Sequence, residues 1–394
     1  MRLVPGSERR ARLARRHGLA PGHRHPDVLT AARAMTALHA TEAATVHLAL
    51  WARTAAVTVA DVEEALYEER TLVKQPAMRR TLWAFPCELL PAVWGSAAER
   101  VAGQQHKDVL KYVAAGGFTD DPEAWVAAAY DATLAALDDG VPRTAAQLRG
   151  LVPALDGRFT LGTPDKKWGG SFPIGRWVID TLAAQGRLLR ATNDGHWRLN
   201  KPTWARTEHW LDPVPEPLAA AAGYVELVRR WLHTFGPGTE ADLVWWFGAT
   251  KAAVRAALAE VGAVEVSLDD GATGWVLPDD LDPVPEVEPW AALLPTLDPT
   301  VMGWRGRDFY LDPDDVPYLF DTNGNAGNTA WWDGRVVGAW AQDDDGVVHV
   351  LPRGDLGAEA TAALAAEAER LTGWLDGVRI VNVYQSQQMK GATL

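Results

Sequence analysis

The fold is indicated most clearly by residues 174–199, IGRWVIDTLAAQGRLLRATNDGHWRL. Within residues 174–182 the apolar side chains recur at the spacing of one helical face, and Gly186 stands where a helix commonly ends. The residues that follow predict two strands, 187–192 and 196–199, joined by an Asn-Asp-Gly turn. The stretch therefore predicts a helix that leads into a β-hairpin.

A shorter helix is expected to precede this unit. Thr144 and Gln147 have the spacing of a capping box, and residues 166–170 are expected to form the loop between the two helices. Two helices followed by a hairpin are typical of the winged-helix module, whose second helix and hairpin can both reach nucleic acid. One module alone could equally serve only to pack against other protein.

The same order of elements is predicted downstream. Thr239 and Asp242 have the spacing of a helix cap, residues 254–261 carry a second helical face, and residues 263–277 predict a hairpin around an Asp-Asp-Gly turn. Together with a weaker copy upstream, this gives three predicted modules in tandem. Three in tandem favour nucleic-acid binding over packing alone.

The weaker copy lies near the N-terminus. Asp61 and Glu64 are expected to cap a helix that ends near Glu69. Residues 72–75 and 80–85 are expected to be the strands of its hairpin.

Proline-rich segments separate the predicted domains. The sequence LDPVPE occurs at residues 211–216 and again at residues 281–286, on either side of the downstream copy. We expect an α+β fold of three tandem winged-helix domains and a C-terminal β-rich domain, at residues 1–95, 96–212, 213–285 and 286–394.

The C-terminal domain is predicted mainly from strand signals. Residues 329–340 predict a hairpin with an Asp-Gly turn, and residues 347–351 and 379–384 predict further strands. The alanine-rich residues 357–375 predict a helix.

Composition excludes several classes of protein. The 394 residues are 47% hydrophobic and 23% charged, which is an ordinary globular balance. A single cysteine, Cys87, excludes a disulfide framework and a cysteine-based metal site. No apolar run reaches the roughly 20 residues of a membrane span, and the arginine-rich N-terminus lacks the apolar stretch of a signal peptide. We therefore expect a cytoplasmic protein.

The charge is unevenly distributed along the chain. The net charge is −13, which argues against a broadly basic nucleic-acid coat. Residues 1–33 carry eight arginines against two acids, a local +6, whereas residues 269–315 carry twelve acids against two arginines, a local −10. Because only charge within a Debye length of about 8–10 Å acts on a bound polyanion, a basic face is compatible with an acidic total.

Five segments resemble the winged-helix DNA-binding-domain family that contains the AlkZ and YcaQ DNA glycosylases. They are ALHATEAATVHLALWAR (37–53), MRRTLW (78–83), FGPGTEADLVWWFG (235–248), LDPTVMGWRGRD (297–308) and DGRVVGAW (333–340). The resemblance implies three tandem winged-helix domains and a C-terminal β-rich domain arranged as a C around DNA. It also implies excision of bulky alkylated purines, including adducts and crosslinks left by natural genotoxins.

The resemblance locates a catalytic motif as well. Family members carry Gln–apolar–Gln or Gln–apolar–Asp just before the helix that ends in LWAR, and the matching residues here are His39, Ala40 and Thr41. His39 could take a proton from water or direct a ring-nitrogen lone pair at developing positive charge, and Thr41 could supply a second hydrogen bond. Alternatively, Thr41 is the N-cap of the following helix and His39 is a structural histidine.

These observations predict a monofunctional DNA glycosylase. The expected substrates are bulky N7-alkylguanine or N3-alkyladenine adducts in double-stranded DNA, and the expected role is self-resistance to a DNA-alkylating natural product. A Schiff-base mechanism lacks a nucleophile near the motif, since the nearest lysine downstream is Lys74. Two alternatives remain: a non-catalytic DNA- or lesion-binding protein, and an interaction scaffold of winged helices.

The expected partners and cofactors follow from this prediction. The partner is double-stranded DNA that carries alkylpurine lesions, with no membrane contact, and we expect a monomer associated with the nucleoid. We expect no cofactor and no metal, because His17, His23 and His25 lack the spacing of metal ligands.

Ten polar residues are candidates for DNA contact. They lie at the first hairpin turn, beside or on the predicted recognition helices, or within the acidic region: Gln75, Arg79, Arg80, Lys166, Lys167, Arg176, Lys251, Arg255, Arg305 and Arg307. Each could instead be an ordinary solvated charge, and the last two could pair with Asp308 or Asp312.

Overall fold

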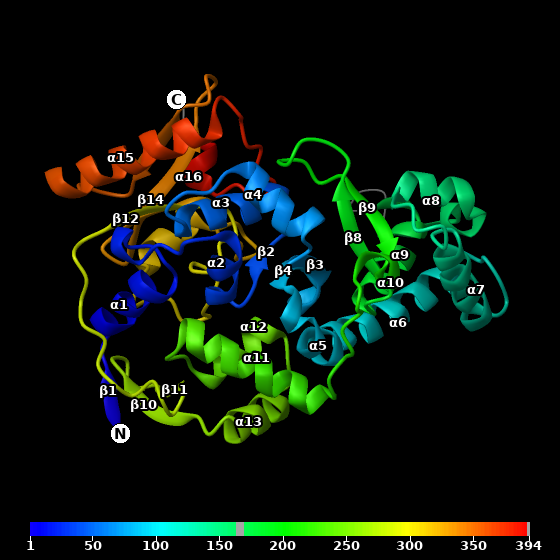
Figure 1. Ribbon diagram of the computed structural model, residues 1–394, viewed down its shortest axis with the longest axis horizontal. Helices are drawn as coiled ribbons and strands as arrows, with labels where there is room; N and C mark the ends of the chain where they lie inside the picture. The colour runs from blue at the N-terminus through cyan, green and yellow to red at the C-terminus, as the bar shows by residue number, and fades with distance from the viewer. Residues whose placement is uncertain (163–168, 392–394) are drawn as a thin grey trace. The chain divides into compact units, whose positions relative to one another are not determined.

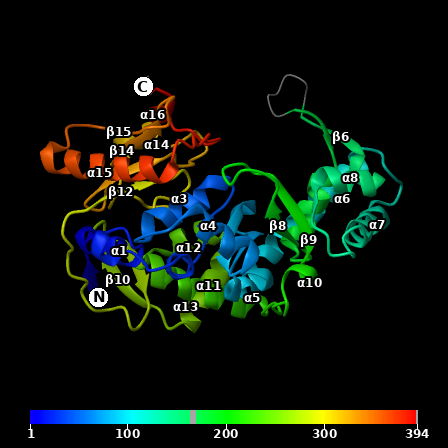
Figure 2. The ribbon, with the colours of Figure 1, turned by 45° about the horizontal axis from the view of Figure 1, so that its top comes forward.

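The computed structural model describes residues 1–162 and 169–391, which form two compact units (Figures 1 and 2). Unit 1 contains Met1–Leu72, Trp83–Pro86 and the chain from Tyr224 onward, and unit 2 contains Val73–Leu82 and Cys87–Gly223. The described helices include none that combines the length and the apolar character needed to cross a membrane.

Unit 1 holds most of the sheets. Its α-helices are α1 (Gly6–Arg16), α2 (Val28–Ala34), α3 (Ala43–Arg53), α4 (Val59–Glu63), α11 (Ala220–Phe235), α12 (Glu240–Phe247), α13 (Lys251–Glu260), α14 (Val316–Leu319), α15 (Gly357–Leu375) and α16 (Gln387–Lys390). Its strands are β1 (Arg2–Val4), β2 (Leu38–His39), β4 (Leu82–Pro86), β10 (Val264–Leu268), β11 (Thr273–Val276), β12 (Ala291–Leu294), β13 (Thr329–Trp332), β14 (Arg335–Gln342) and β15 (Val348–Pro352).

Unit 2 is mainly helical. Its α-helices are α5 (Leu90–Val93), α6 (Glu99–Ala115), α7 (Pro122–Ala135), α8 (Ala145–Leu151), α9 (Gly175–Ala184) and α10 (Thr207–Trp210). Its strands are β3 (Leu72–Pro76), β5 (Arg143–Thr144), β6 (Arg158–Leu161), β7 (Gly170–Pro173), β8 (Leu188–Asn193) and β9 (Pro202–Arg206). Its core is built from apolar side chains of α6, α7, α8 and α9, together with strand residues such as Leu188 and Trp204.

One order of elements recurs in three stretches of the chain. A short extended segment precedes two helices and two strands, and it pairs with the last of those strands: β2 with β4, β5 with β9, and Gly238 with Trp275 of β11. In the second stretch an additional hairpin, β6 with β7, lies between the two helices, where the sequence predicted a loop. The sequence interpretation lacked this first segment, because two residues are too few to show an alternating pattern. The mixed α+β class is confirmed, whereas the division into four domains remains a prediction.

Local signals located the helix starts well. The capping boxes of Thr144 with Gln147 and of Thr239 with Asp242 are both present. The cap predicted at Asp61 and Glu64 was wrong, because Thr58 is the N-cap and Asp61 is its partner. Thr58 stands three residues before Asp61, which is the spacing that a capping box requires.

The return strand predicted at residues 196–199 was also wrong. Strand β9 begins at Pro202, and a wider loop joins it to β8. The side chain of Asn193 closes that loop, because it donates to the carbonyls of Gly195 and His196 and accepts from the Lys201 N–H at 2.9 Å. Because the Asn193 side chain forms hydrogen bonds with the loop backbone, the two strands can be joined by a longer loop instead of a tight turn.

The C-terminal sheet of unit 1 has the antiparallel order β12-β13-β14-β15, and α15 packs across it (Figure 1). The predicted hairpin and the helix at residues 357–375 are confirmed. The strand predicted at residues 379–384 was wrong. The backbone N–H of Ile380 donates to Gln342, and those of Val383 and Tyr384 donate to Glu42, so side chains take the place of a neighbouring strand.

A buried ion pair joins α3 to the loop that begins at Leu297. Arg53 and Asp298 are both fully buried, and the guanidinium donates to the two carboxylate oxygens at 2.8 and 2.6 Å. Arg53 also donates to the Ala49 carbonyl and to the Thr300 hydroxyl. A buried pair is stable only when such additional hydrogen bonds satisfy its remaining donors and acceptors.

The same network contains His17. The Thr234 carbonyl can only accept, so Nε2 of His17 carries a proton and donates to it at 3.2 Å. In the neutral ring Nδ1 is then the acceptor, and the Thr300 hydroxyl, which accepts from Arg53, donates to it at 2.9 Å. Burial, and next the charge of Arg53, lower the pKa of His17 well below its ordinary value. His17 is therefore a neutral link between α1 and its neighbours in unit 1.

Replacing Asp298 tests the ion pair. Asp298→Asn keeps the shape but leaves the guanidinium of Arg53 buried without a counter-charge, so the free energy of unfolding should fall by about 3–5 kcal/mol. Urea denaturation followed by tryptophan fluorescence measures this loss. The matched control is Asp344→Asn, because Asp344 pairs with Arg379 but is 98% exposed, and its loss should stay below about 1 kcal/mol. Equal losses in the two variants would contradict the assignment.

His17 also predicts how stability depends on pH. The unfolded chain binds a proton at this histidine below about pH 6.5, whereas the folded protein does not until a much lower pH. The free energy of unfolding should therefore fall as the pH drops below about 6.5, by up to about 1.4 kcal/mol per pH unit for each such histidine. Urea titrations at several pH values should show a shallower decline in His17→Gln, and an unchanged decline would refute the neutral assignment.

Candidate active site

Strand β2 places His39 against an aromatic surface. His39 lies opposite Trp83 in the antiparallel pairing of β2 with β4, and the two ring centroids are 4.7 Å apart. The side chain of His39 is only 3% exposed, and Trp83 is fully buried. Trp83 in turn contacts Trp246 at 5.2 Å, so the imidazole rests on a rigid aromatic cluster.

The hydrogen bond at Nδ1 indicates which ring nitrogen of His39 accepts. The backbone N–H of Thr41 points at Nδ1 with an N···N distance of 3.4 Å. Nδ1 therefore carries the lone pair, and the neutral ring has its proton on Nε2. Because 3.4 Å is long for a hydrogen bond, a water molecule can compete for this lone pair.

Thr41 does not cap α3, contrary to the alternative drawn from the sequence. The helix begins at Ala43 and its N-cap is Glu42, with no side-chain cap hydrogen bond. Thr41 instead lies in the bend between β2 and α3, where it is half-buried beside His39. The structure thus brings the two candidate catalytic residues together at the start of α3.

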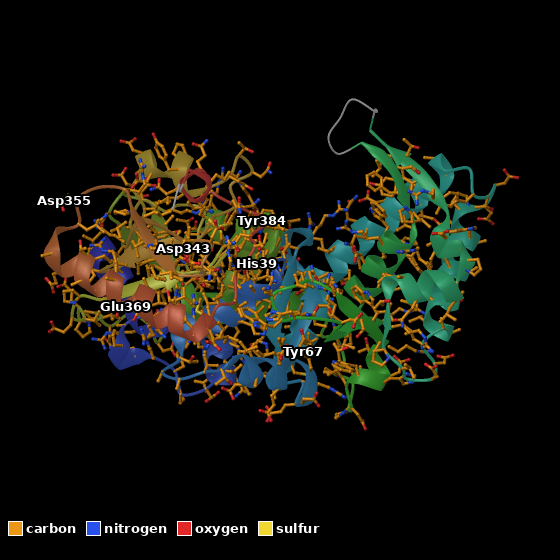
Figure 3. The ribbon with its side chains drawn as sticks, turned by 90° about the horizontal axis from the view of Figure 1, so that it is seen from above. His39, Tyr67, Asp343, Asp355, Glu369 and Tyr384 are labelled. Carbon is orange, nitrogen blue, oxygen red and sulfur yellow. The ribbon has the colours of Figure 1, made fainter. Side chains whose placement is uncertain are left out.

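Glu42 is a residue that the sequence interpretation missed. It is 7% exposed, and one carboxylate oxygen accepts the backbone N–H groups of Val383 and Tyr384 at 2.6 and 2.8 Å. Burial raises the pKa of Glu42 despite these two hydrogen bonds. Figure 3 labels His39 and Tyr384, which come from neighbouring parts of unit 1. In the sequence, a glutamate at the start of a helix does not indicate hydrogen-bond partners more than 300 residues away.

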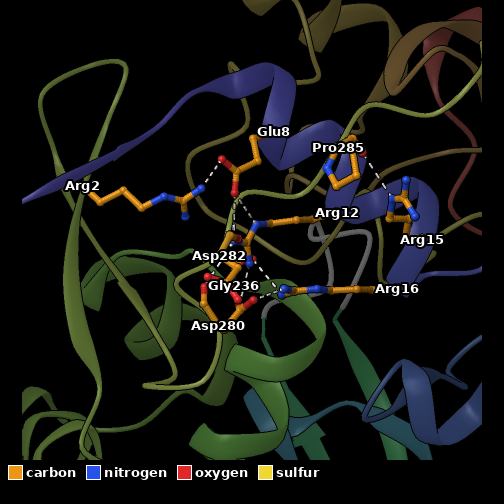
Figure 4. A network of polar contacts seen from close by, with 9 residues as sticks. All are labelled: Arg2, Glu8, Arg12, Arg15, Arg16, Gly236, Asp280, Asp282 and Pro285. Carbon is orange, nitrogen blue, oxygen red and sulfur yellow. Dashed lines mark hydrogen bonds and ion pairs between the residues drawn. The ribbon is translucent and has the colours of Figure 1, made fainter.

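The basic N-terminal segment does not form an open cationic surface. Glu8 pairs with Arg2 and Arg12, and Asp280 pairs with Arg12 and Arg16 (Figure 4). Four further arginines of this segment bind main-chain carbonyls, Phe309 or Glu367, and these are Arg9, Arg10, Arg15 and Arg24. Acidic side chains of unit 1 thus pair with Arg2, Arg12, Arg16 and Arg24, whereas Arg33 is exposed, and binding of a polyanion by this segment stays a prediction.

The hairpin turn of the first module presents its two arginines differently. Arg80 is exposed but pairs with Asp108 of α6 at 2.7 Å, and Arg79 is half-buried. Arg79 and Arg80 have positive φ angles, 56° and 62°, which mark a tight turn. Gln75 is fully buried and donates to the Ala183 carbonyl at 2.8 Å, so its assignment to DNA contact was wrong.

Candidates on the second and third modules lie on the predicted helices. Arg176 on α9 is 79% exposed and 3.5 Å from Asp180. Lys251 and Arg255 lie exposed on α13, and Arg255 makes two hydrogen bonds to Glu240. Lys166 and Lys167 lie outside the described residues.

The two arginines of the acidic region differ from each other. Arg305 is exposed, and its backbone N–H donates to Asp242 at 2.8 Å. The guanidinium of Arg307 lies over Phe320 at 4.7 Å from the ring centroid. In the described part of the chain, neither arginine forms the ion pair with Asp308 or Asp312 that the sequence suggested.

Among the described residues, no group of three or more His, Cys, Asp or Glu side chains could hold a metal ion.

Comparisons with known proteins show the family of this chain. The family described as DNA glycosylase AlkZ-like matches residues 32–374, which include β2, α3 and the C-terminal sheet. Proteins of this class act on DNA bases. The chain belongs to the AlkZ-like DNA glycosylase family.

A solved structure shows the same fold. The Streptomyces sahachiroi DNA glycosylase AlkZ superposes with a TM-score of 0.73 over 95% of this chain and 98% of that chain, at 20% sequence identity. A search of curated proteins gives no match.

Proposed function

We propose that this protein is a monofunctional DNA glycosylase that hydrolyses the N-glycosidic bond of bulky N7-alkylguanine or N3-alkyladenine adducts in double-stranded DNA. Membership of the AlkZ-like family supports the glycosylase activity. The observation that carries the assignment of chemistry is the position of His39 at the end of β2, with Nδ1 as acceptor and Thr41 beside it. Self-resistance to an alkylating natural product is the corresponding biological role.

The reaction needs little acid catalysis. An N7-alkylguanine already carries a positive charge, so the bond between C1′ and N9 can break with both electrons moving to the base, which leaves neutral. The sugar becomes oxocarbenium-like, and a water oxygen bonds to C1′. His39 Nδ1 takes the proton from that water, and the Thr41 hydroxyl orients it by a second hydrogen bond. The product is an abasic site.

Packing around His39 supports this role. A ring held against Trp83 keeps one orientation, and a buried acceptor interacts with developing positive charge more strongly than a solvated one. No lysine stands near the motif in the sequence, which supports hydrolysis by water over a Schiff-base mechanism.

Substitution of His39 tests the proposal. His39→Ala should lower the single-turnover excision rate on an N7-methylguanine duplex by about 10²–10⁴-fold, the usual contribution of a positioned base. His39→Gln should retain part of the rate, because a carboxamide oxygen can still accept from water, and should lose the decline in rate that protonation of His39 causes at acidic pH. Alkaline cleavage of abasic sites measures the product.

The matched control is His349→Ala, because His349 is 42% exposed and pairs with Asp343 on the C-terminal sheet. Its excision rate should equal that of the wild type. A His39→Ala enzyme that excises at the wild-type rate would place the active site elsewhere. A wild-type protein that binds the lesion without excising it would favour the non-catalytic alternative.

The first hairpin turn offers a test of DNA binding. Arg79→Ala/Arg80→Ala should weaken affinity for duplex DNA and reduce the slope of log affinity against log salt by about 0.9 for each phosphate that these arginines neutralise. Asp108→Asn should act in the opposite direction, because it releases Arg80 from its ion pair. Fluorescence anisotropy at several salt concentrations measures both effects, and unchanged affinity and slope in the double variant would exclude these arginines from the DNA interface.

A further inference from the structure

Two valines near the C-terminus are more exposed than apolar side chains usually are. Val381 is 73% exposed and Val383 is 81% exposed. They lie in a segment without regular secondary structure, residues 378–385, which follows α15 and which we call the C-terminal arm. Exposing a valine forgoes about 1.5 kcal/mol or more of burial, so a pair on one short segment requires an explanation.

Exposure alternates along the arm. Arg379, Val381 and Val383 are exposed, whereas Ile380 and Asn382 between them are half-buried. The exposed positions alternate with half-buried ones as far as the bend at residues 383 and 384. The arm thus presents a cation and two valines to solvent.

The backbone of the arm is held at two places. Gln342 of β14 accepts from the Ile380 N–H at 2.8 Å and donates to the Val378 carbonyl at 3.0 Å. Glu42 accepts from Val383 and Tyr384. The valines are therefore exposed on a fixed backbone, and Glu42 is the residue that directly follows Thr41 of the candidate active site.

The charge of the arm matches an anionic partner. Residues 377–391 contain Arg379 and Lys390 and no acidic residue, in a protein whose net charge is −13. Arg379 pairs with Asp344 at 3.0 Å, but both side chains are exposed and such a pair is weak, so a phosphate can replace the carboxylate. They also contain Asn382, Gln385 and further amides of the kind that read the minor groove. An apolar face flanked by a cation and amides suits the sugar-lined minor groove of DNA better than an apolar protein surface.

We propose that the C-terminal arm is an apolar wedge that enters the minor groove beside the lesion, with Val381 and Val383 against the base stack and Glu42 as the positioning residue that ties the wedge to the catalytic strand. This rests on the proposed function, because the duplex at the lesion is the partner. The wedge unstacks the step next to the damaged nucleotide and so brings C1′ to the water at His39. Glu42 touches no reacting atom and acts through the arm.

The experiment uses the full-length protein and a duplex with N7-methylguanine beside 2-aminopurine, whose fluorescence rises when it unstacks. Val381→Ser/Val383→Ser should abolish the rise and lower the single-turnover excision rate by roughly 10- to 100-fold, since misplacement of the reacting groups has such an effect. Val347→Ser is the matched control, because Val347 is 39% exposed in the connection between β14 and β15, and it should behave as the wild type. Glu42→Ala should reproduce the loss, and Glu42→Gln should restore most of it, because an amide oxygen can accept the same two N–H groups.

The outcomes separate this inference from the proposed function. A double valine variant with wild-type fluorescence and wild-type excision would overturn the wedge while leaving the glycosylase intact. A wild-type protein without excision would overturn the proposed function. The fluorescence of 2-aminopurine would then test the wedge by itself. Loss of the fluorescence rise in the double valine variant would support the wedge, and a rise that persists in this variant would overturn the wedge. Because both valines are exposed, their replacement should leave the melting temperature unchanged, so a misfolded variant does not obscure the result.

Discussion

The buried pair of Arg53 and Asp298 is the interaction on which the candidate active site depends. It fixes the C-terminal end of α3, while Glu42 fixes the other end through its hydrogen bonds to the C-terminal arm. His39 and Thr41 stand immediately before this helix, so any shift of α3 moves them. A catalytic group must be held within about 0.5 Å of its working position, and two separate attachments to the C-terminal part of unit 1 provide that constraint. The ion pair cannot loosen without leaving a buried charge unpaired, and loss of the Glu42 contacts would leave two backbone N–H groups without that acceptor.

The distribution of charge along the sequence gave a misleading picture of the surface. The eight arginines of residues 1–33 look like a polyanion-binding segment, yet Arg12 is 2% exposed and lies between Glu8 and Asp280. The acidic region that starts at residue 269 contributes one of these carboxylates, so part of the positive charge of residues 1–33 is paired within unit 1. Composition cannot reveal such pairing, because it depends on the strand pairing of β1 with β10, which brings the two segments together.

Local signals predicted much of the fold, and long-range pairing decided what they missed. Capping boxes and apolar periodicity predicted α8, α12 and α15, because these features act between residues less than about five positions apart. The two-residue strands β2 and β5 form only because they pair with β4 and β9. The strand predicted at residues 379–384 does not form, because side chains rather than a neighbouring strand accept hydrogen bonds from its backbone N–H groups. At the candidate site, His39 and Thr41 were chosen from the family resemblance, and their catalytic role stays a prediction. Trp83 and Glu42 became visible only through a cross-strand contact and a hydrogen bond between residues 341 positions apart.

The burial of His39 limits what can reach it. A side chain that is 3% exposed cannot contact a bulky adduct directly, so the proposed function requires that only a water molecule reaches the lone pair on Nδ1, where the bond from the Thr41 N–H is long. In the proposed reaction, the damaged base and its attached group therefore stay outside the buried motif. Only the water molecule and one face of the sugar need to meet at His39 and Thr41. Such a site does not have to enclose the leaving base, because the positive charge of an alkylated purine already makes it a good leaving group. An active site built around the sugar and the water, rather than around the base, tolerates adducts of different size and shape.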